Sequence, residues 1–265
     1  MSVIEISWLD LSWGAVLVLA LALVSHLARL GLGRDIVIAA VRTVLQLALI
    51  GLVLETLFEL GALHWVALLA MAMLLIAGRE VMARQQRRLK GGWAFTIGTL
   101  SMFVSSFTVT IFALGAVIGP QPWYQPQYAI PLLGMMLGNT MTGVALALDR
   151  LTEGAWQQRQ LIEARLMLGQ PWREAAGNIR REAMRSGMIP TINAMATAGV
   201  VSLPGMMTGQ ILAGTAPTLA VRYQVLIMFL VAAGTGAGTM IAVLLGSRRL
   251  SDARERLRLD RLQDA

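Results

Sequence analysis

The sequence predicts an all-α polytopic membrane protein with about seven transmembrane helices. Of its 265 residues, 56% are apolar and only 14% are charged, whereas a soluble domain has about 25% charged residues. The apolar residues also come in runs that reach the roughly 20 residues needed to cross the hydrocarbon core of a bilayer. Because no stretch between these runs is long enough for a soluble domain, we expect one transmembrane domain over residues 1–265.

The individual spans follow from where the apolar runs are interrupted. Residues 91–148 carry no charge and are too many for one helix, so the run divides at 119–128, GPQPWYQPQY, where prolines and interfacial aromatic residues favour a surface turn. The last long run divides near Pro217. The expected spans are approximately 11–28, 36–58, 60–78, 94–118, 128–148, 188–213 and 223–247.

The distribution of positive charge predicts the orientation of these spans. Alternating them places 29–35, 79–92, 149–187 and 247–265 on one side, and these segments hold 20 of the 22 Lys and Arg residues. Loops rich in Lys and Arg stay in the cytoplasm, so we expect the N-terminus outside and the C-terminus inside. The net charge of +7 then reflects membrane topology, and no nucleic-acid partner is expected. The cytoplasmic tail 248–265 has leucines among mixed charges, which predicts a helix anchored at the anionic inner leaflet.

Residues 149–187 form the longest polar segment between two spans and carry seven arginines and five acidic residues. A charged helical segment of this kind is what a permease needs if a soluble motor protein is to push on it. Gly169-Gln170-Pro171-Trp172 is typical of a corner between two helices, with Pro171 starting the second helix. Trp172 is then available as an anchor.

The sequence offers little for catalysis by this chain. It has no cysteine, and its one lysine, Lys90, does not follow the glycine-rich turn of a P-loop. His26 and His64 are expected near opposite faces of the membrane, and no HExxH motif is present. We therefore expect a transporter rather than an enzyme, with no cofactor bound by this chain.

Polar side chains inside the expected spans are candidates for a substrate path, because burying them in hydrocarbon is costly and usually functional. Arg42 is equally consistent with snorkelling to the interface, and Glu55 with an interfacial acid. The Leu203-Pro204-Gly205 sequence predicts a broken helix, which either lines a cavity or packs against its neighbours. The candidates are Arg42, Gln46, Glu55, Asn139, Thr142, Asn193, Thr197, Ser202, Pro204, Thr208 and Gln210.

Two further patterns allow two interpretations each. GxxxG pairs at Gly134/Gly138 and Gly234/Gly238 predict close helix packing, including a dimer seam. Sixteen methionines without a cysteine suit either a soft metal such as Cu(I) or flexible apolar packing. Packing is favoured, because Met135-Met136 and Met206-Met207 are adjacent pairs that face different directions on a helix. The identity of any metal stays open.

The segment Glu163-Ala164-Arg165-Leu166-Met167-Leu168-Gly169 resembles the EAA-xxx-G loop that docks ABC-transporter permeases onto their ATPase. Glu163, Ala164 and Gly169 match this motif, while Arg165 departs from it. More widely, AAVRTVLQLALIG, PLLGMMLGNTMTGVALALDRL, EARLMLG and VVSLPGMMTGQILAG are similar to the FetB family of iron-export permeases, from about the second span to the seventh.

The resemblance implies a permease of the bacterial inner membrane that works as a homodimer with a separate ABC ATPase, which holds ATP and magnesium. It also implies iron export linked to metal homeostasis and oxidative-stress resistance. The ATPase-coupling residues would be Glu163, Ala164, Arg165, Gly169, Pro171 and Trp172. Two alternatives remain: ABC export of an organic anion or a nucleotide sugar, and a carrier that uses no ATPase.

Overall fold

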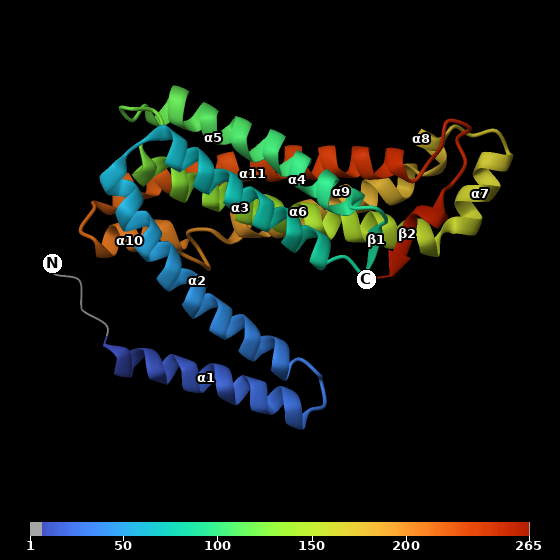
Figure 1. The fold of residues 1–265 in the computed structure, drawn as a ribbon. Coiled ribbons are helices and arrows are strands. Elements are labelled where there is room, and N and C mark those ends of the chain that lie inside the picture. The colour runs from blue at the N-terminus through green and yellow to red at the C-terminus, as the bar shows by residue number, and fades with distance from the viewer. Residues whose placement is uncertain (1–6, 265) are drawn as a thin grey trace. The chain divides into compact units, whose positions relative to one another are not determined.

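The computed structural model describes residues 7–264, and nearly all secondary structure within them is helical (Figure 1). Contacts divide the chain into two compact units. Unit 1 contains the residues up to Ala62 together with Leu212–Thr215, and unit 2 contains Leu63–Ile211 and Ala216–Ala265.

Unit 1 is a hairpin of two helices, α1 (Trp8–Leu27) and α2 (Gly33–Leu60). Ser7 and Asp10 form a capping box that satisfies backbone N–H groups at the start of α1. Gly61 ends α2 in the left-handed conformation. Both helices are mostly apolar, and most of their side chains are exposed within the chain, which is typical of helices that face lipid or another subunit.

Unit 2 is a helical bundle with a small two-stranded sheet at one end (Figure 1). A single long helical segment runs from Trp93 to Ile118 and includes two π-helical stretches, η1 and η2. The elements in chain order are α3 (Leu63–Ala83), β1 (Arg87–Leu89), α4 (Trp93–Met102), η1 (Phe103–Phe107), α5 (Thr108–Phe112), η2 (Ala113–Ile118), α6 (Pro126–Gln157), α7 (Arg159–Met167), α8 (Trp172–Ala175), α9 (Gly177–Thr197), α10 (Gly205–Leu212), α11 (Pro217–Arg249), η3 (Leu259–Arg261) and β2 (Leu262–Asp264).

Helix α6 lies against α3, α9 and α11, and small residues allow the closest of these contacts. A Cβ atom at Gly143 would lie 2.6 Å from Cγ2 of Thr235 and 2.9 Å from the carbonyl oxygen of Gly187. Gly234 and Gly238 of α11 also meet side chains of this same chain, including Thr140 of α6. The second GxxxG pair therefore serves packing within the subunit, as small residues do between membrane helices.

Five helix ends meet at one end of unit 2, called here the polar end. Strand β1, between α3 and α4, pairs antiparallel with β2 from the C-terminal tail, with Leu89 opposite Leu262. The C-terminal end of α6 is tied to β1, because Arg87 forms an ion pair of 3.0 Å with Glu153. The end of α11 lies there too, because Trp172 of α8 donates a hydrogen bond to Ser247 of α11. Helix α8 leads through Ala176 into α9, so the start of α9 lies at the same end.

Six helices of the described residues have the length and composition of a membrane span: Leu9–Leu27, Gly33–Glu59, Leu63–Ala83, Trp93–Ile118, Pro126–Gln157 and Pro217–Arg249. The chain is therefore an all-α polytopic membrane protein. Of the expected division at 119–128, residues 119–125 lie between η2, which ends at Ile118, and α6, which begins at Pro126. The expected span 188–213 is not one continuous helix, since α9 ends at Thr197 and α10 begins at Gly205.

The predicted helix in the C-terminal tail is wrong. After α11 the described part of the tail forms turns, a 3-10 helix and β2. The carboxylate of Asp252 accepts the backbone N–H groups of Arg254 and Arg256, and such local bonds compete with helical ones. The edge of β1 supplies partners for β2 that the tail sequence alone does not reveal.

The close contact at Gly143 of α6 can be tested by comparing two glycine substitutions in the same helix. Gly143→Ala should lower the stability of the bundle by about 1–3 kcal/mol, because the new methyl group has to displace α9 or α11. Gly138→Ala in the same helix should cause little change, since nothing lies within 4 Å of its Cβ position. The melting temperatures of both variants, measured in detergent, test this expectation. Equal melting temperatures for the two would show that the contact at Gly143 is not tight.

Candidate functional site

The first candidate site is the corner between α7 and α8, called here the elbow (residues 163–172). Helix α7 ends at Met167, and Gly169 adopts a φ of +83°, which favours glycine. The N–H of Gly169 donates to the carbonyl of Leu166, and that of Gln170 donates to the carbonyl of Arg165. Pro171 is extended and leads directly into α8, so the predicted corner is present at the predicted residues.

The elbow exposes an apolar tip and one acidic side chain. Met167 is 82% exposed and Leu168 is 83% exposed. Glu163 and Gln170 line an open groove of about 670 Å³, whose other wall is formed by tail residues 254–257. Ala164, Gly169 and Pro171 are exposed as well. A protruding apolar tip beside a groove with charged walls is suited to contact with another protein.

Trp172 anchors the elbow to the rest of unit 2 and is buried. Its Nε1 donates to Oγ of Ser247 in α11 at 3.1 Å. Its backbone N–H donates to Oε2 of Glu255 in the tail at 2.9 Å, so a tail carboxylate satisfies the start of α8. Arg165 donates to the carbonyl of Ala175 at 3.3 Å. The anchor expected from the sequence therefore acts within this chain, and the ring of Trp172 is not presented at the surface.

Charge pairs hold the tail that supports the elbow. Asp252 accepts bonds from the backbone and guanidinium of Arg256, and these bonds keep the pKa of the Asp252 carboxyl well below its ordinary value of 3.8. Arg258 lowers the pKa of Asp260 to about 2. Because both pKa values are lowered by folding, the stabilisation is complete above the ordinary pKa and is lost only as the pH falls through the lowered values.

The second candidate site surrounds the interruption between α9 and α10, called here the break (residues 198–204). Gly199 has a φ of +82°, and its N–H donates to the carbonyl of Ser202 at 2.8 Å. The N–H of Ser202 donates to the carbonyl of Thr197 at 3.2 Å. Pro204 precedes the first residue of α10. The break is thus a compact turn that satisfies part of its own backbone, as irregular structure at membrane depth requires.

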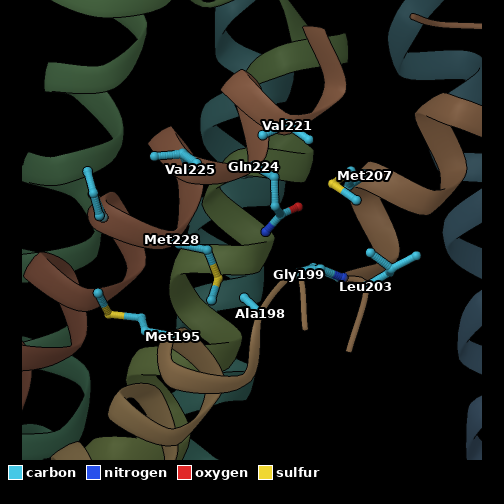
Figure 2. Close-up of a pocket in the computed structure, with 11 residues that line it drawn as sticks. Met195, Ala198, Gly199, Leu203, Met207, Val221, Gln224, Val225 and Met228 are labelled. Atoms are coloured by element: carbon cyan, nitrogen blue, oxygen red, sulfur yellow. The ribbon is translucent and has the colours of Figure 1, made fainter. Parts of the chain in front are cut away.

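Two cavities lie beside the break, with volumes of about 390 Å³ and 330 Å³. Both are lined by Met195 of α9, Pro204, and Gln224 and Met228 of α11. Figure 2 shows the larger one, into which the side chain of Gln224 extends from α11. Asn139 of α6 lines the smaller one. Both cavities are mainly apolar: the side chain of Gln224 is the polar one in the larger cavity, and the smaller cavity adds those of Asn139 and Thr191. An apolar lining with a few polar groups is usual for a ligand pocket.

The structure brings only some of the predicted path residues together. Asn139 and Pro204 line cavities, whereas Thr142 is half-buried and donates to the carbonyl of Gly138. Five others lie on the helices and turn around the break without lining either cavity: Asn193, Thr197, Ser202, Thr208 and Gln210. Three belong to unit 1, where they are exposed on α2: Arg42, Gln46 and Glu55.

Sequence reasoning missed Gln224, which lines both cavities. The available signal was an amide at the second residue of the last expected span, 223–247, a position that also suits a residue at the membrane interface. Thr191 of α9, which lines the smaller cavity, was missed in the same way. Within residues 7–264, no group of three or more His, Cys, Asp or Glu side chains is placed to hold a metal ion.

The bond between Glu255 and the elbow gives a testable consequence. Glu255→Ala should raise the exchange rate of the Trp172 amide at least tenfold, because the N–H loses the carboxylate that accepts it. Arg254→Ala is the matched control, since it changes a neighbouring exposed side chain and keeps the backbone bond to Asp252. Hydrogen exchange with mass spectrometry measures the exchange rate of the Trp172 amide in both variants. Unchanged protection in the Glu255 variant would contradict the anchoring role.

Comparison with known proteins gives consistent matches over almost the whole chain. The model of an uncharacterised protein family, UPF0014, matches residues 8–251. A UPF0014 membrane protein of Synechocystis is 41% identical over 87% of this chain and 88% of its own. The probable iron export permease protein FetB of Escherichia coli is 30% identical over 96% of both chains. The UPF0014 membrane protein YjkA of Bacillus subtilis is 34% identical over 84% of this chain and 86% of its own.

No solved structure gives a significant match. The family match and the identities with these three relatives are sufficient for a classification. The chain belongs to the UPF0014 family of membrane proteins, which includes the FetB permease.

Proposed function

We propose that this membrane permease is the transmembrane subunit of an ABC exporter whose cargo is iron. The observation that carries the proposal is the elbow, an exposed apolar corner fixed to α11 and to the tail by Trp172. A surface that protrudes yet is braced from behind suits the transfer of force from a soluble motor. The chain has no P-loop, so ATP and magnesium belong to a separate ATPase subunit.

The proposed topology has seven membrane crossings, with the N-terminus outside and the C-terminus in the cytoplasm. The polar end of unit 2 supports this topology, because the end of α3, the start of α4, the end of α6, the start of α9 and the end of α11 meet there. Since α9 leaves this end and α11 returns to it, α9, the break and α10 together complete one crossing. Arginines gather at this end, as expected of a cytoplasmic face.

The proposed mechanism couples the elbow to the break through α9. When the ATPase dimer closes on ATP, its grooves move the tip at Met167 and Leu168. Helix α8 leads through Ala176 into α9, which extends about 30 Å at 1.5 Å per residue to the break. A displacement of the elbow would thus shift the walls of both cavities. Because one chain supplies only one elbow, a homodimer with two ATPase subunits is the expected assembly, in the bacterial inner membrane.

Iron is the first candidate cargo because a relative that matches over nearly the full chain is a probable iron export permease. Export of an organic anion or a nucleotide sugar remains the second candidate, and Arg42 is the intramembrane cation that would favour it. A carrier without an ATPase would leave the braced elbow without a role. The ABC assignment therefore accounts for more of the structure.

Two elbow substitutions test the coupling role. Gly169→Pro should reduce transport-coupled ATP hydrolysis at least tenfold, because proline fixes φ near −65° and cannot adopt the observed +83°. Glu163→Ala should act in the same direction by removing the carboxylate from the groove. Glu174→Ala, an exposed acid in α8, is the control and should retain activity. Normal membrane insertion with normal coupled hydrolysis in both elbow variants would disprove the docking role.

The cargo is tested by expressing the chain with its ABC ATPase in a strain deficient in iron efflux. Cellular iron should fall after an iron load only when both subunits are present and the ATPase is intact. An assembled complex that hydrolyses ATP while iron stays constant would disprove iron export and retain the ABC assignment. Iron that falls equally without ATP hydrolysis would identify a carrier that needs no ATPase.

A further inference from the structure

Methionines from four helices gather around the two cavities beside the break. Met195 of α9, Met207 of α10 and Met228 of α11 line the larger cavity (Figure 2). Met195 and Met228 also line the smaller one, together with Met135 of α6 and Met206 of α10. Met206 and Met207 do face different directions, as the sequence indicated. They nevertheless reach two adjoining cavities that share a wall.

Gln224 supplies a polar group that has no partner in this setting. Its side chain is buried, with 8% of the residue exposed, and its Oε1 atom accepts no hydrogen bond. In Figure 2 this oxygen points toward Met207 across the cavity. A buried acceptor without a partner costs about 1–3 kcal/mol and calls for an explanation such as a bound ligand or water. Apolar packing explains the methionines but leaves this oxygen unsatisfied.

The charge of the cavity walls limits what a ligand can be. No Asp, Glu, Lys or Arg side chain lines either cavity. The cost of moving an ion from water into a medium of low dielectric constant is large and grows with the square of its charge. A divalent ion would meet only neutral ligands, and Mg²⁺ or Ca²⁺ would lack the oxygen ligands they require. Thioethers are soft donors that select Cu(I), which carries a single charge.

We propose that the larger cavity is a binding site for a soft monovalent cation of the Cu(I) class. The thioether sulfurs of Met195, Met207 and Met228 and the Oε1 atom of Gln224 would be its ligands. The three rotatable bonds of methionine let sulfurs from three helices converge on one ion. The site goes beyond iron export and depends on neither the ATPase nor the direction of transport. It also places a ligand where α9, the break and α11 meet.

Silver(I) is the probe for the test, because it resembles Cu(I) in softness and charge and does not change oxidation state in air. The full chain, purified in detergent, is equilibrated with Ag(I), desalted and analysed for bound metal. We expect about one Ag(I) per chain, displaced by Cu(I) under reducing conditions. The cavity variant Met195→Leu/Met207→Leu/Met228→Leu should bind at least tenfold more weakly, and Gln224→Leu should also bind more weakly. Leucine keeps the volume of methionine, so folding is preserved.

The control variant is Met71→Leu/Met82→Leu/Met240→Leu, which removes three thioethers that line neither cavity. It should bind Ag(I) as the unmodified chain does. Equal loss of binding in the control and cavity variants, or no Ag(I) bound by the unmodified chain, would overturn the proposal. Fe(II) bound with the same dependence on the three methionines would overturn the restriction to monovalent ions. Because no ATPase is present, none of these outcomes depends on the test of iron efflux.

Discussion

The close approach of α6 to α9 and α11 is the contact on which the rest of unit 2 depends. In a bilayer, apolar side chains gain little from leaving lipid, so helices associate through packing at small residues. Gly143 and Gly187 face each other, and a Cβ atom at Gly187 would lie 2.6 Å from the carbonyl oxygen of Gly143. This contact fixes the first half of α9 against α6. Helix α8, at the end of the elbow, leads directly into this packed part of α9.

Unit 2 is closely packed on one side of this contact and contains cavities on the other. Toward the polar end, α9 is packed on α6, while the tail, β1 and Trp172 tie the helix ends together. Toward the break, α9 ends at Thr197, and two cavities lie beside it. If an ATPase moves the elbow as proposed, the movement would be transmitted through the closely packed half of unit 2. The movement would then change the shape of the cavities beside the break, where packing is incomplete.

Six of the seven expected spans correspond to helices long and apolar enough to cross a membrane. They could be predicted from the sequence because the thickness of the hydrocarbon core is a local requirement on each segment. The corner at Gly169 and Pro171 and the break at Pro204 were also predictable, since proline and glycine act on their own backbone. The strand in the tail and the role of Gln224 could not be predicted from such local features. The tail forms β2 with a strand that lies more than 170 residues earlier. The importance of Gln224 appears only when α9, α10 and α11 enclose it.

The distribution of charge in unit 2 bears on how any ion could pass. Arg and acidic side chains collect at the polar end, whereas the cavities beside the break are lined by thioethers, amides and apolar groups. A bare divalent ion at these cavities would have no carboxylate to offset its charge. Iron export through them would therefore need charge from a second copy of the chain or from ligands that accompany the ion. A soft monovalent ion needs neither, because neutral sulfur and amide donors are sufficient to hold it.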